Sequence, residues 1–229
     1  MNIIGHRGAS NLALENTLEG IQAALKAGVD AIEFDIRITS DQKIVLCHDK
    51  HLGRISSHQH HVNDHPLKKL KKILLHNGQK IPTLTEAIKI AGTKPLFIEG
   101  KDDGWAQPLA VLLKKQKYTS TFRVISFNIQ ELYTFSLLAP KIPVYALEKT
   151  NPFEVIRIAN VLGFSGVDMN FWLLNPLTYV MARFHKLDII VYTVNKPWLA
   201  RFLHILYPRI SITTDVPDQM QFLRKKKHR

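Results

Sequence analysis

The chain alternates short apolar segments with segments of helical periodicity over almost its whole length, and this alternation limits the possible folds more than any other feature. Repeated strand and helix signals are typical of parallel sheets, in which helices form the crossover connections. We expect eight core strands, which start near Ile3, Ala31, Pro95, Phe122, Pro143, Gly166, Asp188 and Ile210. Eight such units predict a (β/α)₈ barrel, a fold that routinely takes roughly 250 residues as one domain.

The predicted organisation is a single α/β domain over residues 1–229, a (β/α)₈ TIM barrel with a small insertion after the second strand. The extended run Lys43–His48 is expected to join the second strand as a hairpin. Residues 49–80 are polar and rich in histidine, with one amphipathic helix signal over 67–74, and we interpret them as the insertion. A doubly wound open sheet is the structural alternative, but the sequence contains no G-x-G-x-x-G loop to support a nucleotide site.

The formal net charge of +12 would draw the protein toward anions such as phosphorylated metabolites, nucleic acid or a lipid surface. Much of the excess is local, in the LKKLKK run of residues 67–72 and in the basic tail of residues 224–229. Such runs are usually solvated faces or frayed ends, so we expect no nucleic-acid partner. The sequence gives no indication of the oligomeric state.

Cys47 is the only cysteine, so an intramolecular disulfide is impossible. No charged and then apolar leader precedes the first strand, and no apolar run reaches the roughly 18 residues needed to span a bilayer. We therefore expect a cytoplasmic protein without stable membrane insertion.

The first predicted strand delivers a histidine and an arginine to its carboxyl end, at His6 and Arg7, and Gly8 then permits a tight exit. A histidine can move a proton near neutral pH, and an arginine offers a rigid fork of donors for phosphate or carboxylate. Taken alone, this dipeptide favours a non-catalytic interpretation, with His6 as a hydrogen-bonded core histidine and Arg7 as a surface charge. Partners elsewhere in the chain must therefore decide its role.

Carboxylates end the next predicted strands, and a barrel would bring them to one mouth. Glu33 and Asp35 are two apart on a strand, so both point to the same side, and Glu99 ends the following core strand. Three buried carboxylates would repel one another unless protonated or bound to a cation, and hard oxygen ligands suit Mg²⁺ or Ca²⁺. The sequence therefore favours a metal site, with salt bridges to Lys101 or Arg37 as the alternative.

Several short motifs in order carry a resemblance to a known family. They are HRG at 6–8, ENT at 15–17, EFD at 33–35, HD at 48–49, PTL at 82–84, E-x-K at 99–101, SF at 126–127, YTVN at 192–195 and TD at 214–215. In this order they resemble the glycerophosphodiester phosphodiesterase family over essentially the entire chain, and the tract 190–197 is similar to its bacterial cytosolic members. Each motif alone is weak, but the ordered set is a strong signal.

The resemblance implies a TIM barrel, a divalent cation (Mg²⁺ or Ca²⁺), and hydrolysis of a small-molecule glycerophosphodiester to sn-glycerol 3-phosphate and an alcohol. Matched position by position, it implies a catalytic acid–base pair at His6 and His48, metal ligands at Glu33, Asp35 and Glu99, and phosphate contacts at Arg7 and Lys101. Similarity to phosphatidylinositol-cleaving barrels implies His6 as the base and His48 as the acid.

Two asparagines and a group of histidines have open roles. Asn170 and Asn195 lie at predicted strand ends, where they are expected either to bind the glycerol hydroxyls or to tie loops together. The histidines of the insertion lack regular ligand spacing, so we interpret them as solvated, with a second metal site as the remote alternative. They are His51, His58, His60, His61 and His65.

Two positions depart from the family pattern. Leu14 stands where the family usually has proline, which puts the rigidity of that loop in question. Gly100 replaces an apolar residue between Glu99 and Lys101, and because glycine weakens a strand, we expect a looser backbone beside Glu99.

Two further function classes remain open at this level. The same barrel supports lipid phosphodiesterases similar to sphingomyelinase D, although the lone cysteine and the YTVN tract argue against a secreted lipid enzyme. The chain could also be a non-catalytic, basic barrel that binds anions or membranes. Its intact histidine pair and acidic trio argue against that interpretation, since a binder would not need them.

Overall fold

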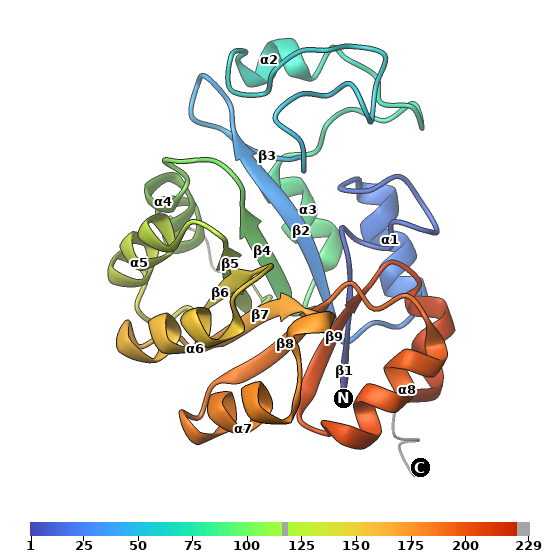
Figure 1. Ribbon diagram of the computed structural model, residues 1–229. Coiled ribbons are helices and arrows are strands. Elements are labelled where there is room, and N and C mark those ends of the chain that lie inside the picture. The colour runs from blue at the N-terminus through green and yellow to red at the C-terminus, as the bar shows by residue number, and fades with distance from the viewer. Residues whose placement is uncertain (116–118, 224–229) are drawn as a thin grey trace.

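The computed structural model describes residues 1–115 and 119–223, and these form a closed barrel of eight parallel strands (Figure 1). In order around the barrel, the strands are β1 Asn2–Gly5, β2 Ala31–Ile38, β4 Leu96–Gly100, β5 Phe122–Ser126, β6 Val144–Glu148, β7 Gly166–Asn170, β8 Asp188–Tyr192 and β9 Ile210–Thr214. Pairing of β1 with both β9 and β2 closes the sheet. The predicted (β/α)₈ barrel is therefore confirmed, and the extra strand β3, Ile44–Leu46, pairs antiparallel with β2 as expected.

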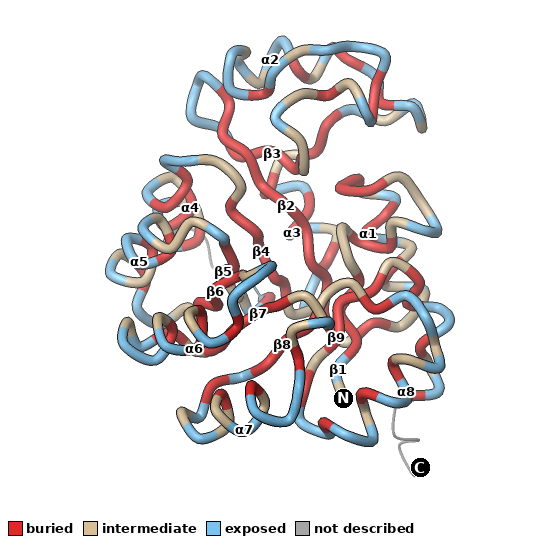
Figure 2. The backbone as a smooth tube through the Cα atoms, viewed as in Figure 1, coloured by how far each residue is buried: buried red, intermediate tan, exposed pale blue. Residues whose placement is uncertain are grey.

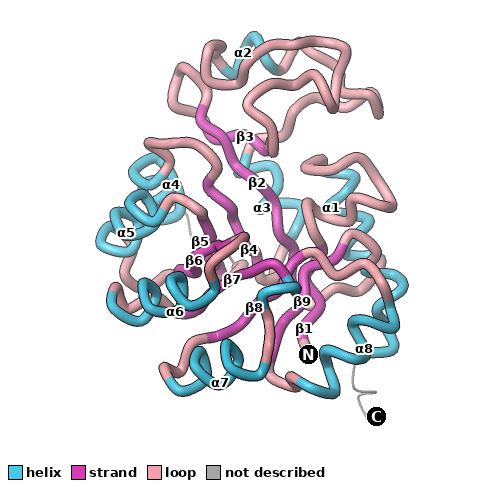
Figure 3. Tube along the Cα trace, viewed as in Figure 1, coloured by secondary structure: helices cyan, strands magenta, loops and turns pink. Residues whose placement is uncertain are grey.

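Helices alternate with the strands and surround them (Figure 3). They are α1 Leu18–Lys26, α3 Leu84–Ala91, α4 Ala106–Lys115, α5 Ile129–Leu138, α6 Pro152–Val161, α7 Pro176–Phe184, α8 Pro197–Leu206 and the 3₁₀ segment η2 Pro217–Leu223. At the start of α3, Thr83 and Glu86 form a capping box that satisfies free backbone donors.

The barrel strands are mostly buried (Figure 2), and the alternation of side chains along each strand divides their residues into two sets. One set of strand residues packs outward against the helices and forms the main core, which includes Phe34 and Ile36 of β2. The other set points into the barrel. Toward the amino ends of the strands that inner set is apolar, with Ile4 and Phe97 among its members, whereas Glu33 and Asp35 follow toward the carboxyl end.

Residues 49–80 lie between β3 and α3, beyond the carboxyl end of β2 (Figure 1). The helix expected there is short, because α2 covers only Leu67–Leu70. The segment is not purely polar, since it contributes Leu52, Val62 and Ile73 to a second apolar core. Leu14, which stands where the family usually has proline, packs against this second core.

The histidines of this segment are exposed or half-exposed, in agreement with the solvated state that we predicted, and three of them contact one another. His58 and His60 stack with ring centroids 5.7 Å apart, and His65 Nε2 lies 3.0 Å from His60 Nδ1. Desolvation, followed by electrostatic interactions with His65 and Lys69, lowers the pKa of His60.

The expectation of a loose backbone at Gly100 is wrong. Gly100 is buried and pairs with Ile36 across the β2–β4 ladder. A Cβ atom placed there would lie 2.2 Å from the indole of Trp105, a fully buried side chain. The glycine therefore makes room for Trp105, and that packing supports the strand that carries Glu99.

Two further expectations concern the chain ends and the membrane. The basic tail of residues 224–229 lies outside the described residues. In the described part of the chain, no helix combines the length and the apolarity that crossing a membrane requires.

Candidate active site

The predicted site residues of the first strands meet at one pocket, which lies at the carboxyl end of the barrel and has a volume of about 170 Å³. Its lining includes His6, Arg7, Glu33, His48, Glu99 and Lys101. The sharp exit after β1 makes this possible. Gly8 has a φ of +89°, and a Cβ there would lie 2.5 Å from the backbone of Gly20 in α1, so a larger residue would push the loop out of place.

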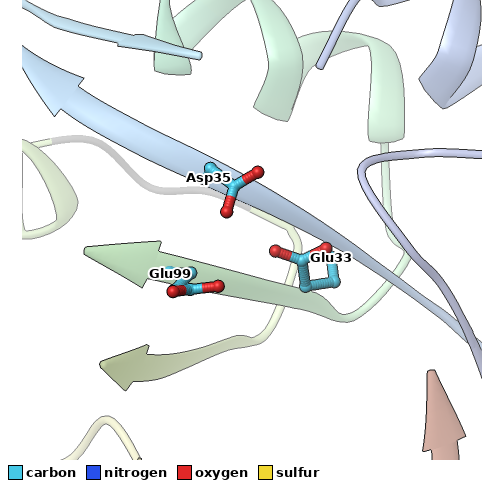
Figure 4. A group of neighbouring side chains, drawn as sticks. All are labelled: Glu33, Asp35 and Glu99. Carbon is cyan, nitrogen blue, oxygen red and sulfur yellow. The ribbon is translucent and has the colours of Figure 1, made fainter. Parts of the chain in front are cut away.

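The acidic trio comes from two neighbouring strands (Figure 4). Glu33 and Asp35 share the inner face of β2, and Asp35 pairs with Glu99 across the β2–β4 ladder. One ligand atom from each of the three lies within 4.8 Å of the others. Among the described residues, this is the only group of three or more acidic, histidine or cysteine side chains with that geometry.

The electrostatics of the trio fit a hard divalent cation. Burial, together with the charge of Asp35, raises the pKa of both Glu33 and Glu99 to about 8. Glu33 Oε2 accepts a hydrogen bond from the Arg7 backbone N–H at 2.8 Å, while the buried Glu33 Oε1 has no partner. An unsatisfied carboxylate oxygen beside two further carboxylates is a donor set that Mg²⁺ or Ca²⁺ would stabilise.

Lys101 and Arg7 provide part of the countercharge to these acids. Lys101 Nζ lies 2.5 Å from Glu99 Oε1 and 3.0 Å from Asp35 Oδ1. Arg7 Nε lies 3.3 Å from Asp35 Oδ2, while its NH1 contacts Glu15 at 3.0 Å. Burial opposes ionisation of Asp35, but Lys101 and Arg7 hold its pKa well below the usual range. Of the two cations that we considered as salt-bridge partners of the trio, Lys101 therefore does pair with its carboxylates.

Arg37, the other partner considered for the trio, serves a different role. Its guanidinium pairs with Asp102 and donates to the backbone carbonyl of His48, with Nε at 3.0 Å from that oxygen. Arg37 therefore holds the backbone of the His48 loop rather than an acid of the trio.

His6 is oriented by a carboxylate from the far end of the chain. Its Nδ1 lies 2.6 Å from Asp215 Oδ1, just after β9, and Ser10 Oγ donates to the same oxygen at 2.5 Å. Burial lowers the pKa of His6, but the hydrogen bond to Asp215 and the charge of Glu33 outweigh it, so the pKa is raised. Since Nδ1 is engaged, Nε2 remains for a ligand.

His48 has a parallel arrangement. Its Nδ1 lies 2.7 Å from Asp49 Oδ1, and Arg54 Nε contacts the other oxygen of Asp49 at 2.6 Å. Burial lowers the pKa of His48, and Asp35 only partly offsets that effect. The two histidines of the pocket therefore have pKa values displaced in opposite directions.

The two asparagines make contacts within loops. Asn170 Oδ1 accepts from the Trp172 backbone N–H at 3.1 Å. Asn195 Nδ2 donates to Asp215 Oδ2 at 2.6 Å, and its Oδ1 accepts from the Asp215 backbone N–H at 2.9 Å. These contacts agree with the loop-tying alternative, and Asn195 also fixes the carboxylate that holds His6. Binding of glycerol hydroxyls by either residue stays a prediction.

Sequence reasoning missed several residues that shape the site. Asp168 of β7 lines the pocket, is 3% exposed, and has one oxygen without a partner, and burial raises its pKa to about 8. Asn16 clasps Asp35 with two hydrogen bonds, at 2.8 and 3.0 Å. A signal existed for Asp215, since it follows the last strand, and for Asp168, which lies two residues from Asn170 on one strand face.

A larger cavity of about 340 Å³ lies at the opposite end of the barrel. Its lining includes Asn2, Ala31, Pro95 and Asp188, which begin or precede strands. Barrel enzymes use the carboxyl end of the strands, and the histidine pair and acidic trio belong to that end. The smaller pocket is therefore the candidate active site.

Comparisons with known proteins identify the family of the chain. A sequence model of the glycerophosphoryl diester phosphodiesterase family matches residues 6–226. The chain is 30% identical to YhdW of Bacillus subtilis, over 95% of this chain and 96% of that protein. It is 28% identical to a glycerophosphodiester phosphodiesterase of the same species, over 84% and 76%.

Solved structures add a match of fold. A glycerophosphodiester phosphodiesterase from Parabacteroides distasonis has a TM-score of 0.83 at 26% identity, and covers 97% of this chain and 95% of its own. An Oleispira antarctica phosphodiesterase, solved in complex with the product sn-glycerol-3-phosphate, has a TM-score of 0.89 at 24% identity, with 97% and 96% covered. The chain belongs to the glycerophosphoryl diester phosphodiesterase family and is an enzyme of that class.

Proposed function

We propose that the protein hydrolyses small soluble glycerophosphodiesters to sn-glycerol 3-phosphate and an alcohol, in a reaction that depends on a divalent cation and on His6 and His48. One observation carries the proposal. Each histidine is held through Nδ1 by its own carboxylate, Asp215 or Asp49, and both line the pocket that Glu33 and Glu99 also line. A carboxylate that orients an imidazole in this way prepares its second nitrogen for proton transfer.

The histidines divide the proton transfers between them. The leaving alkoxide is strongly basic, so one group must protonate it while another takes a proton from the nucleophile. We assign His6 as the base and His48 as the acid. In the cation-free protein their pKa shifts have the reverse order, with His6 raised and His48 lowered. Glu33 contributes to the raised pKa of His6, and neutralising that carboxylate would remove its contribution.

Glu33, Asp35 and Glu99 would hold the divalent cation, for which Mg²⁺ and Ca²⁺ are the candidates. When bound, a cation of this kind stabilises the charge that gathers on the nonbridging phosphate oxygens. Arg7 and Lys101 line the same pocket, and we propose that they contact those oxygens as well. Both keep their charge for this role, because carboxylates raise the pKa of each above what burial alone would give.

We assign the nucleophile to the substrate's own glycerol 2-hydroxyl. A hydroxyl tethered beside the phosphorus reacts in an effectively unimolecular step, which can gain several powers of ten over attack by external water. His6 takes the hydroxyl proton, His48 protonates the departing alcohol, and water then opens the cyclic phosphate in the reverse sense. An analogue with hydrogen at that position should bind without reacting, whereas its hydrolysis at a normal rate would leave direct attack by water.

The alternative substrate class is a lipid. A mouse relative named lysophospholipase D GDPD3 is 26% identical over 76% of this chain. This match keeps lysophospholipids among the substrates to test. The non-catalytic interpretation is set aside, since the family is one of enzymes.

A coupled assay for sn-glycerol 3-phosphate tests the proposal. Purified protein should release it from several glycerophosphodiester head groups, lose activity in EDTA, and regain it with Mg²⁺ or Ca²⁺. The same assay on lysophospholipids measures the alternative. Full activity after exhaustive chelation would contradict the cation requirement, and a strong preference for lysophospholipids would replace the proposed substrate class.

A further inference from the structure

The outer faces of α7 and α8 expose an unusual set of large apolar side chains. On helix α7, Leu177, Val180 and Phe184 follow at helical spacing along the face that points away from the barrel, and Phe184 is 80% exposed. The short 3₁₀ segment just before that helix, Phe171–Leu173, adds Trp172, which is 79% exposed. Since helix formation does not require these side chains to be apolar, their exposure calls for another explanation.

Helix α8 continues the same surface. Trp198, Phe202 and Ile205 occupy one face of that helix, with Trp198 66% exposed, and Leu206 lies beside them. Tyr179 of α7 contacts Tyr207, the residue that follows α8, and their ring centroids are 5.0 Å apart. We call the eight exposed residues the α7–α8 face. They are Trp172, Leu177, Val180, Phe184, Trp198, Phe202, Ile205 and Leu206.

The charges in this part of the chain are mostly positive. From 171 to 209 the sequence contains five lysines and arginines and a single acidic residue, Asp188. Four of the five cations are exposed, and they are Lys186, Lys196, Arg201 and Arg209. Neither helix carries an acidic residue. A surface that combines exposed Trp, Phe and Leu with lysine and arginine matches an anionic lipid interface.

The face also has a definite position relative to the active site. Both helices begin in loops that follow β7 and β8, so their first turns lie near the mouth of the barrel and their last turns near its base. Trp172, Leu177 and Trp198 are therefore at the mouth end, whereas Phe184 and Ile205 are at the far end. A flat surface that covered the face would lie beside the active-site mouth.

We propose that the α7–α8 face docks the protein on the surface of an anionic phospholipid bilayer. The aromatic and aliphatic side chains enter the boundary between headgroups and acyl chains, while Lys196, Arg201 and their neighbours contact the phosphates. A second copy of the chain fits less well. A two-fold interface would place the face of one copy against the same face of the other. The cations of the two copies would then repel one another, because each copy contributes a single acidic residue, Asp188, to offset them. The proposal concerns binding and does not rest on the reaction assigned above.

Flotation with vesicles tests the proposal directly. The full-length protein should float with vesicles of phosphatidylglycerol and phosphatidylcholine, and much less with vesicles of phosphatidylcholine alone. Trp198→Ser/Phe202→Ser should lower the partition coefficient at least ~10-fold through lost apolar burial. Arg201→Gln should lower it about fivefold, since one cation near an anionic surface contributes roughly that factor. Raising the salt from 0.1 to 1 M should weaken binding further.

Matched variants separate the face from general effects. Leu137→Ser/Val161→Ser removes two apolar side chains that are 65% and 68% exposed on α5 and α6, and Lys89→Gln removes an exposed cation on α3. Both controls should float like the wild type. Because none of these residues lines the pocket, kcat/KM on a soluble glycerophosphodiester should stay unchanged in every variant and report on folding.

The remaining outcomes overturn the proposal. Flotation that is equal for both vesicle types, or equal for the face variants and the controls, would show that the α7–α8 face is not a docking surface for anionic lipid. Light scattering identifies the competing occupant. A wild-type dimer that Trp198→Ser/Phe202→Ser converts to a monomer, without any vesicle binding, would assign the face to a second copy of the chain.

Discussion

Binding of a divalent cation to the acidic trio should release up to two protons at pH 7. Burial and the charge of Asp35 raise the pKa of both Glu33 and Glu99 to about 8 in the cation-free protein. The two glutamates therefore hold more protons at pH 7 than at pH 9. Asp35 contributes no proton, since Lys101 and Arg7 keep its pKa low. Cation ligands must be deprotonated, so binding expels the protons that the two glutamates hold.

Isothermal titration calorimetry measures this release. Titrating Mg²⁺ or Ca²⁺ in two buffers with different ionisation enthalpies should give heats that differ by up to two buffer ionisations at pH 7 and by much less at pH 9. The sign follows from the raised pKa values. Below pH 8 the apparent affinity should rise with pH, by up to roughly 10²-fold per pH unit when both glutamates titrate, and above pH 8 it should level off.

Variants identify the source of the protons. Glu33→Gln should reduce the release to about one proton and weaken affinity, because it removes one titrating ligand. His6→Ala should keep most of the release, which distinguishes the glutamates from the neighbouring imidazole, whose pKa is also raised. Heats at pH 7 that do not depend on the buffer, together with equal affinity at pH 7 and pH 9, would refute the placement of two protonated carboxyls in this site.

Two predictions concern the supports of the site. Gly100→Ala should destabilise the fold by about 1–3 kcal/mol or more in urea unfolding, because the new Cβ would meet the Trp105 indole at 2.2 Å, and Trp105→Phe in the same chain should recover part of the loss. A neutral effect would contradict that packing. Asp168→Asn should stabilise the protein in EDTA, since burial raises the folded-state pKa of Asp168 to about 8 and folding must bind a proton there. The gain should grow between pH 5 and pH 7.5, by up to about 1.4 kcal/mol per pH unit, and a gain independent of pH would contradict the assignment.

The convergence of the acidic trio and His6 at one end of the barrel could be predicted because it depends on rules local to the strands. Glu33 and Asp35 point to the same side of their strand because side chains alternate with a period of two residues. The barrel places the carboxyl ends of all strands at one mouth, so His6 and Glu99 could be placed beside them before any contact was known. The partners of these residues obey no such rule. Asp215 lies 209 residues from His6, and its role depends on closure of β9 onto β1.

Packing explains the other differences between expectation and structure. The sequence predicts a weak point in the strand at Gly100. The structural role of that glycine depends on Trp105, whose side chain packs against the strand at this position. Residues 49–80 read as polar, yet their few apolar side chains meet Val45 and Ile81 from the flanking segments and form a core together. Composition reports the average character of a segment, whereas the core depends on which side chains the backbone brings together.

The roles of the two histidines can be assigned by changing the leaving group. If His48 is the acid, His48→Ala should lower kcat at least ~10²-fold on an alkyl glycerophosphodiester, whose alkoxide needs a proton, and far less on the p-nitrophenyl ester, whose phenolate leaves unprotonated. His6→Ala should be impaired on both substrates, because the nucleophile still requires a base.

The opposite pattern, in which the p-nitrophenyl ester restores the activity of His6→Ala but not that of His48→Ala, would make His6 the acid and His48 the base. That outcome would match the pKa directions of the cation-free protein, in which Asp215 and Glu33 favour the protonated form of His6 while burial favours the neutral form of His48. The experiment therefore also decides whether the resting electrostatics persist in the working enzyme. Equal losses on both substrates in both variants would contradict separate acid and base roles, and would leave His6 and His48 as groups that position the phosphate.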